Sequence, residues 1–201
     1  MGMDKKLHVV FNGTSPLIEH NPQGVNPLNK YTLALGEITG KAKKDKTEED
    51  YIKISDLEWE SGLYWNDDIG LVVPNECLFA TITEGAKVWK QGKNIQKFTQ
   101  IVQGVAPLDI GEKQDYEKLK KDMRFRDVRT VRVKTARVIR TRPRFSTWRT
   151  EFDLVYDDEK IDVQTIIRAI EYAGNYVGLM EMRQFGYGRF AASVSEVEMV
   201  G

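Results

Sequence analysis

Arginine and aromatic side chains alternate in one short stretch of the sequence, RTRPRFSTWRTEF, which runs from residue 140 to residue 152. The stretch holds four arginines and three aromatic residues, and its first acid is Glu151. A guanidinium group binds phosphate through paired hydrogen bonds, and an aromatic ring offers a face on which a base can stack. Residue types in this pattern suit the non-covalent binding of a polyanion.

The basic charge of the chain is concentrated around this stretch. The 201 residues include 30 basic and 30 acidic ones, so the formal net charge is zero. Between Arg124 and Arg149, however, ten residues are basic, nine of them arginine, and one is acidic. This segment carries +9 and the rest of the chain −9, a segregation that produces a local positive field. A solvated strand face would explain the same charges without a ligand.

A glycine-rich segment near the C-terminus repeats the combination of arginine and aromatic residues. It reads GLMEMRQFGYGRF over residues 178–190. Glycine allows positive φ and a close approach of the backbone to a ligand, which suits a phosphate backbone with stacked bases. The alternative is a tight connection whose aromatic residues fill the core. The segment is not a dinucleotide-binding fingerprint, because a strand is predicted to follow it and not a helix.

We predict that these two segments form the binding surface for nucleic acid. Phe145, beside Pro143, is the preferred base-stacking residue, since strand alternation turns Trp148 inward with Phe152. His20 and Asn21, in a proline-rich loop, are weaker candidates for ligand contact. The predicted nucleic-acid-binding residues are Arg132, Lys134, Arg137, Arg140, Arg142, Arg144, Phe145, Trp148, Arg149, Arg183, Phe185, Tyr187, Gly188 and Arg189.

Residues for catalysis are scarce in this chain. One cysteine and two distant histidines, His8 and His20, give no zinc-binding pattern, and no nucleophile or nucleotide-phosphate motif is present. We therefore predict no catalytic residue, no bound metal and no cofactor. A nuclease that uses Glu60, Asp67 and Asp68 is the one enzymatic alternative that the acidic residues leave open.

The composition also indicates the compartment. No apolar run approaches the roughly 18 residues of a membrane span, and the apolar run near the N-terminus is too short for a secretory signal. The single cysteine, Cys77, fits a reducing compartment. We expect a cytoplasmic protein without a membrane partner.

The elements that position the candidate residues follow from periodicity and caps. The first half predicts a strand over residues 6–12, a helix over 30–38, a helix over about 48–61 that begins with a Thr47–Asp50 capping box, and a second capped helix that ends before Gly92. The second half predicts strands over 98–105, 130–141 and 148–156, a helix from Asp162 to Gly174, and a last strand to about Val197.

Two features of these elements determine the predicted topology. The apolar phase changes within residues 130–141, which a bulge near Thr135 would explain, and this strand is predicted to pair with 148–156 in a hairpin whose turn is rich in arginine. The order of elements predicts an α+β fold with a ferredoxin-like or RRM-like antiparallel sheet. We expect one domain over residues 1–201, with a helical insertion after the first strand at about 13–92.

The unit of two strands, a helix, a glycine-rich loop with FGYGRF and a final strand resembles the RAMP superfamily, the RRM-like proteins of CRISPR effector complexes, which include Cas7-type backbone subunits. The resemblance implies binding of single-stranded nucleic acid through the sheet face, the hairpin and the glycine loop, and assembly into oligomers or filaments. On this chain it points to Gly186, Tyr187, Gly188 and Arg189 and to the arginine-rich hairpin.

A second resemblance covers most of the chain. The segment FNGTSPLIEHNPQGVNPLNKY, together with TRPRF and GRF nearer the C-terminus, is similar to small phage-encoded proteins of unassigned function. It implies a phage or prophage protein inside a bacterial host.

The sequence therefore predicts a non-enzymatic protein of phage type that binds single-stranded DNA or RNA. The alternative is a charge-segregated assembly or inhibitor protein that docks on protein partners, because arginine and aromatic residues are also enriched in protein interfaces.

Overall fold

The computed structural model describes residues 5–133 and 136–198, and the chain divides into two compact units. Unit 1 takes residues 1–17, 65–113 and 146–201, and unit 2 takes residues 18–64 and 114–145. Unit 2 has 18 basic and 13 acidic residues and unit 1 has 12 and 17, so they carry +5 and −5. The charge segregation of the sequence thus largely coincides with the division into units.

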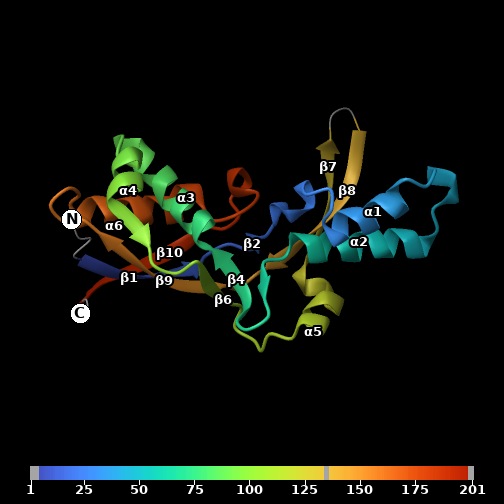
Figure 1. Ribbon diagram of the computed structural model, residues 1–201, viewed down its shortest axis with the longest axis horizontal. Helices are drawn as coiled ribbons and strands as arrows, with labels where there is room; N and C mark the ends of the chain where they lie inside the picture. The colour runs from blue at the N-terminus through green and yellow to red at the C-terminus, as the bar shows by residue number, and fades with distance from the viewer. Residues whose placement is uncertain (1–4, 134–135, 199–201) are drawn as a thin grey trace. The chain divides into compact units, whose positions relative to one another are not determined.

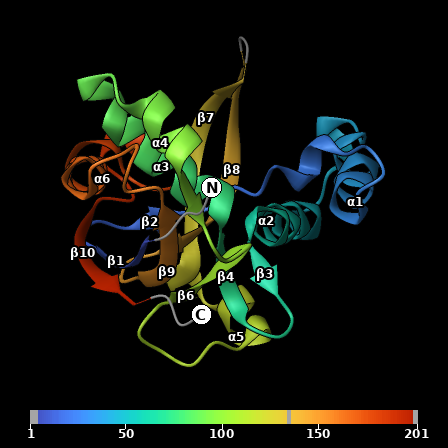
Figure 2. The same ribbon diagram turned by 60° about the vertical axis from the view of Figure 1, so that its left-hand side comes forward.

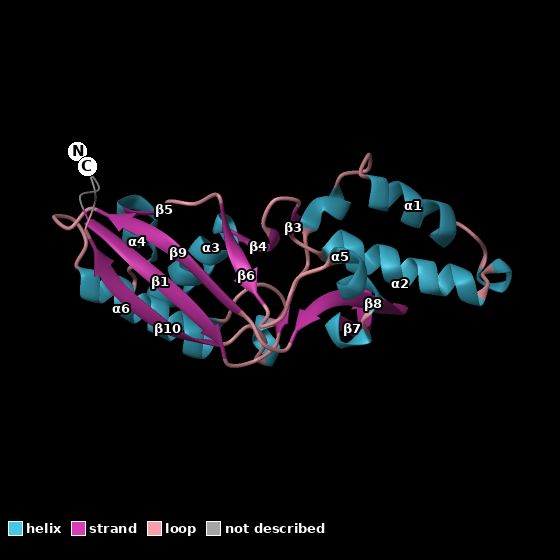
Figure 3. Ribbon diagram, turned by 90° about the horizontal axis from the view of Figure 1, so that it is seen from below, coloured by secondary structure: helices cyan, strands magenta, loops and turns pink. Residues whose placement is uncertain are grey.

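Unit 1 is built on a seven-stranded sheet. The strand order is β10-β1-β9-β6-β4-β3, and β5 also pairs with β9. The helices α3, α4 and α6 cover one face of this sheet (Figure 3). The elements are β1 (Lys5–Gly13), β3 (Trp65–Asn66), β4 (Gly70–Pro74), α3 (Asn75–Ala86), η3 (Lys87–Trp89), α4 (Gly92–Phe98), β5 (Thr99–Ile101), β6 (Val105–Asp109), β9 (Arg149–Tyr156), α6 (Val163–Tyr172), η5 (Ala173–Val177), η6 (Arg183–Phe185) and β10 (Phe190–Val197).

The central strands of unit 1 have the ferredoxin-like arrangement, which confirms the predicted fold class. Strand β1 pairs antiparallel with both β9 and β10, and β5 and β6 pair with β9 on its other side. The first crossover runs through α3 and α4 and the second through α6, as in a split βαβ fold. Helix α3, which we expected within the insertion at 13–92, therefore belongs to unit 1 with the sheet.

The core of unit 1 follows from the alternation of β1 and β9. Leu7, Val9 and Phe11 are fully buried on one face of β1, and Val9 lies directly opposite the buried Phe152 of β9. The rings of Phe11 and Phe190 stack with their centroids 3.8 Å apart. The side chains on the other face of both strands are half-buried or exposed, so the sheet has one covered and one open face.

Unit 2 combines helices with a three-stranded sheet of order β2-β8-β7. Its long helices α1 and α2 are labelled in Figure 1, and Figure 2 shows β7 and β8 side by side. The elements are β2 (Leu17–Ile18), which reaches into unit 2 with its second residue, η1 (Pro22–Val25), α1 (Lys30–Thr39), η2 (Lys43–Asp45), α2 (Glu48–Gly62), α5 (Tyr116–Lys121), η4 (Met123–Phe125), β7 (Arg126–Val133) and β8 (Ala136–Phe145).

The predicted hairpin is wrong in its pairing. Strand β8 pairs antiparallel with β7, and β9 pairs with β1, β5 and β6. The predicted single strand over 130–141 is in fact the end of β7 and the start of β8, and Thr135 lies outside the described residues. The change of apolar phase that we assigned to a bulge marks the reversal of the chain between two paired strands.

Within residues 5–133 and 136–198, no helix has both the length and the apolar character that a bilayer crossing requires.

Close packing between α3 and α6 gives a test of the fold of unit 1. A Cβ atom added at Gly85 would lie 2.3 Å from the backbone oxygen of Ala169, which cannot move without shifting α6. We expect Gly85→Ala to lower the free energy of unfolding by about 1–3 kcal/mol. Gly36→Ala in α1 is the control, since nothing lies within 4 Å of its added Cβ, and it should raise stability by up to about 1 kcal/mol. Urea unfolding followed by circular dichroism measures both, and equal stability of the two variants would contradict this packing.

Candidate nucleic-acid interface

Helix α2 is the support on which the basic hairpin β7–β8 rests. The helix begins with the predicted capping box, in which the Thr47 side chain accepts from the Asp50 backbone N–H and the Asp50 side chain accepts from that of Thr47. Asp50 also accepts two hydrogen bonds from Lys41 Nζ, which help to lower its pKa. These hydrogen bonds fix the start of α2.

Acidic residues of α2 bind the base of the hairpin. Arg126 donates through Nη2 to Asp56 Oδ1 at 2.6 Å, and its side chain is only 6% exposed. The Ser55 hydroxyl of α2 lies 2.9 Å from the Thr141 hydroxyl of β8. Glu58 accepts from Arg140 Nη1 at 2.6 Å and from the Thr141 backbone N–H at 2.8 Å. Arg126 and Arg140, which supply part of the local basic charge, therefore hold the fold together.

The hairpin carries two pairs of directly opposed arginines, which differ in their exposure to solvent. Arg129 lies opposite Arg140. Each has an acidic partner, since Arg129 pairs with Asp127 and Arg140 with Glu58.

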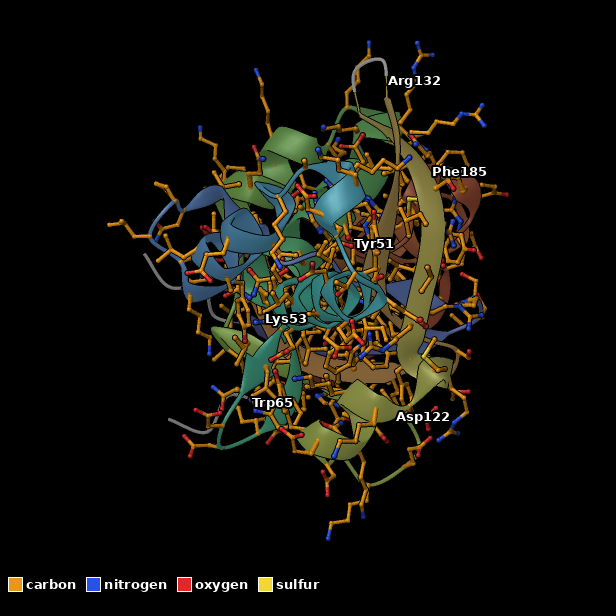
Figure 4. The ribbon with its side chains drawn as sticks, turned by 90° about the vertical axis from the view of Figure 1, so that its right-hand side faces the viewer. Tyr51, Lys53, Trp65, Asp122, Arg132 and Phe185 are labelled. Carbon is orange, nitrogen blue, oxygen red and sulfur yellow. The ribbon has the colours of Figure 1, made fainter. Side chains whose placement is uncertain are left out.

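The second pair lies nearer the end of the hairpin. Arg132 lies opposite Arg137, and both are exposed. Figure 4 shows Arg132 at the end of the hairpin. Like charges directly opposite on one sheet face repel each other.

The remaining predicted residues of the hairpin are less accessible. Arg144 is half-buried, and so is Arg142, whose Nε and Nη1 atoms are buried and have no hydrogen-bond partner among the described residues. In the register of the hairpin, Arg142 lies opposite the buried Asp127. Lys134 lies outside the described residues. Arg149 belongs to β9 in unit 1, where it is exposed and pairs with Glu151.

Phe145 and Trp148 are core residues, so their predicted base-stacking role is wrong for this structure. Phe145 is completely buried, and its ring packs against that of Phe125 with centroids 5.9 Å apart. The Trp148 ring fills the space over Gly13, and its Nε1 donates to the Ser15 carbonyl at 2.8 Å. The apolar alternation of β9 had indicated the burial of Trp148, whereas Pro143 next to Phe145 suggested an exposed turn that does not exist.

The glycine-rich segment forms a compact loop of unit 1 whose glycines serve the chain itself. Gly178, Gly186 and Gly188 all have positive φ. The Gly188 N–H donates to the Pro16 carbonyl, its own carbonyl accepts from Leu179, and an added Cβ would lie 2.1 Å from the Leu179 oxygen. Gly188 is buried, so the close approach that we attributed to a ligand is an approach to the loop's own backbone.

The side chains of this loop remain candidates for ligand contact. Phe185 is 65% exposed, which is unusual for a phenylalanine ring, and Arg183, Tyr187 and Arg189 are half-buried. A pocket of about 650 Å³ lies beside the loop and is lined by Arg183, Gln184, Arg189 and Tyr176, together with Glu84 and Glu181. Figure 4 labels Phe185.

His20 and Asn21 lie where unit 2 begins, and Asn21 is occupied by the fold. Its side chain accepts from the Gln23 N–H and donates to the Leu63 carbonyl at 3.2 Å, so it caps η1 and is not poised for a ligand. His20 is exposed and its carbonyl lies 3.5 Å from the Tyr64 hydroxyl.

The open face of the sheet in unit 1 does not offer the expected stacking platform. On β1 and β9 this face carries Lys6, His8, Arg149, Glu151 and Asp153 and no aromatic ring. His8 Nδ1 lies 3.0 Å from Asp153, and Lys6 Nζ lies 3.4 Å from it. The two carboxylates on this face pair with Lys6 and Arg149, which leaves no excess of basic charge, so unit 1 differs here from an aromatic RRM surface.

The residues of the nuclease alternative do not meet in one unit. Glu60 belongs to unit 2, where it accepts from Lys120 at 2.7 Å and from the Tyr116 hydroxyl at 3.0 Å. Asp67 and Asp68 belong to unit 1. In the described part of the chain, no three histidine, cysteine or acidic side chains gather as a metal-binding group would.

Comparison with known proteins finds similarity among solved structures. No protein-family model and no curated protein matches the chain. Among solved structures, the chain is similar to a chain of a cryo-EM structure of the Type III-B Cmr-beta bound to cognate target RNA, with a TM-score of 0.56 and 10% sequence identity. The similarity covers 96% of this chain and 61% of that one. At this level of identity the similarity shows a shared fold, consistent with the α+β, RRM-like sheet of unit 1.

The buried Glu19 beneath the hairpin gives a prediction for pH dependence. This carboxyl group is inaccessible to solvent, and it accepts from the Tyr64 N–H at 2.9 Å, while its own N–H donates to the Pro143 carbonyl. Burial raises the pKa of Glu19 well above its usual value of 4.5. At a pH above the usual pKa of 4.5, the unfolded chain releases the Glu19 proton and the folded chain retains it. The free energy of unfolding therefore falls as the pH rises.

We expect Glu19→Gln to remove this dependence. The difference in melting temperature between variant and wild type should therefore grow in favour of the variant between about pH 4.5 and pH 8. Glu37→Gln, on an exposed position of α1, is the control and should show a constant difference. A constant difference for Glu19→Gln as well would mean that Glu19 is ionised in the folded protein.

Proposed function

We propose that this chain is a non-enzymatic protein of phage type that binds single-stranded nucleic acid. The proposal is carried by the exposed pair Arg132 and Arg137, which lie directly opposite each other near the end of the hairpin. Two guanidinium groups on one face of a two-stranded ribbon present their donors together, and a phosphate between them relieves their repulsion.

Base stacking is assigned to the loop of unit 1. Phe185 is 65% exposed in the loop that also carries Arg183 and Arg189, and an aromatic ring accepts any base without sequence preference. With Phe145 and Trp148 in the core, Phe185 is the remaining phenylalanine or tryptophan of the predicted set with an accessible face.

The similar structure supports RNA as the first ligand to test, since the Cmr-beta structure contains bound target RNA. The phage origin and a cytoplasmic location inside a bacterial host rest on the resemblance of the N-terminal segment and on the single cysteine. Assembly into an oligomer belongs to the same proposal through the RAMP-like fold.

Fluorescence anisotropy with equal-length single-stranded RNA, single-stranded DNA and duplex oligonucleotides tests the charge contribution. Affinity for single strands should fall steeply with salt, with a log–log slope of about −0.7 for each phosphate contacted. Removing both arginines in Arg132→Ala/Arg137→Ala should weaken binding and reduce the steepness of the slope by about 1.4 if each contacts one phosphate.

Lys93→Ala/Lys97→Ala is the matched control, because it removes two exposed charges from unit 1. It should leave the slope almost unchanged. Binding that does not depend on salt, or an equal effect of both double variants, would contradict a phosphate site at the hairpin end.

Phe185→Ala tests the stacking contribution. The loss of one stacked base should weaken binding by about 1–3 kcal/mol, which is roughly 5- to 150-fold, without a change in the salt slope. Val88→Ala, which shortens another exposed apolar side chain of unit 1, is the control and should bind as the wild type does. An unchanged affinity of Phe185→Ala would remove stacking on this ring from the proposal.

A further inference from the structure

A groove of about 1350 Å³ runs through unit 2. Its walls are α2, the segment that joins α1 to α2, the turn of α5 and η4, and one face of the hairpin β7–β8. Every residue that lines it belongs to unit 2. The bonds from α2 to Arg126, Arg140 and Thr141 fix two of the walls against each other. The groove is therefore a preformed feature of this unit.

The groove is lined by apolar side chains that remain largely exposed. Ile139 is 66% exposed, Ile52 56% and Val128 51%, and Met123 and Tyr51 are similarly open to solvent. Figure 4 labels Tyr51 on α2. The antiparallel register of β7 and β8 places the side chains of Val128 and Ile139 on the same face of the hairpin. Apolar groups gathered in this way on one surface mark a site of interaction.

The size and chemistry of the groove favour a protein segment over other occupants. Its volume exceeds the range of about 300–1,000 Å³ that is usual for small-molecule pockets. Its apolar side chains are mainly aliphatic, and Tyr51 is the one aromatic residue among those that line it, so it offers little for base stacking. Aliphatic side chains between a helix and a sheet face suit an amphipathic helix, which inserts apolar residues from one of its faces.

The charges around the groove specify the polar face of that helix. Seven basic and four acidic residues line it. Two of the acids, Asp56 and Glu58, already pair with Arg126 and Arg140 within the walls. The rim keeps a positive excess at exposed positions such as Lys43, Lys121 and Arg137. A partner with acidic side chains beside its apolar face gains attraction at this rim.

We propose that this groove is the docking site for an acidic amphipathic helix of a partner protein. The inference does not rest on nucleic-acid binding, since the apolar walls of the groove carry it. Arg137 belongs both to the rim of the groove and to the hairpin end, so the proposed surface for a protein and the proposed surface for a polyanion adjoin each other in unit 2.

The first probe is a fluorescein-labelled synthetic peptide of about 18 residues, five helical turns, with leucine along one face and glutamate along the other. Anisotropy against the full-length chain should show saturable binding. A peptide with the same leucine face and lysine in place of glutamate should bind at least about tenfold more weakly, and so should a peptide of the same composition with the helical pattern scrambled. Equal binding of the three peptides would overturn the proposal.

Two variants of the chain locate the contact. Ile52→Asp and Ile139→Asp place a carboxylate in the groove at exposed positions, where the fold should tolerate it, and circular dichroism checks that it does. Each should weaken binding of the leucine–glutamate peptide by about tenfold or more. Leu33→Asp, on an exposed apolar position of α1 that does not line the groove, is the matched control and should bind the peptide as the wild type does.

Two other results would assign the groove to a different occupant and refute the proposal. The first is competition, in which a single-stranded oligonucleotide displaces the peptide and loses affinity in Ile139→Asp. The second is self-association in analytical ultracentrifugation that is lost in Ile52→Asp and Ile139→Asp, since a second copy of the chain would then fill the groove. If the oligonucleotide fails to bind at all but the peptide binds as expected, the proposed nucleic-acid function fails and the docking groove stands.

Discussion

The arrangement of unit 2 depends on the neutralisation of the basic hairpin by carboxylates where the hairpin meets α2. Arg126 is almost fully buried there, and Asp56 is its acidic partner. A buried guanidinium group without its partner would destabilise the fold by about 3–5 kcal/mol. The fold therefore requires Asp56 and Glu58 at the hairpin base. At the other end of the hairpin, Arg132 and Arg137 are exposed.

Along one face of the hairpin, the side chains change from a buried base to an exposed end. Near the base, Arg126 and Thr141 bind α2. Further along the same face, Val128 and Ile139 line the apolar groove, and near the end Arg132 and Arg137 are exposed. The alternation of a strand places all six side chains on one side, so a single ribbon provides a buried anchor, an apolar surface and a cationic surface in succession.

The sequence predicted well what depends on local pattern. The capping box of Thr47 and Asp50 identified the start of α2, and the alternation of β9 indicated that Trp148 points inward. It predicted poorly what depends on pairing between distant segments. The change of apolar phase near Thr135 has two local explanations, a bulge or a chain reversal, and the choice between them depends on which strand lies beside β8.

The candidate site shows the same limit. Composition identified the arginines but gave no means to distinguish Arg140, which binds Glu58 across 82 positions of sequence, from Arg137, which is exposed. The groove was not foreseen, because α2, η4 and the hairpin are brought together only by folding. At physiological salt, charges are screened over about 8 Å. A ligand therefore responds to the local distribution of charge that folding creates, and a chain with no net charge can still present a cationic hairpin end.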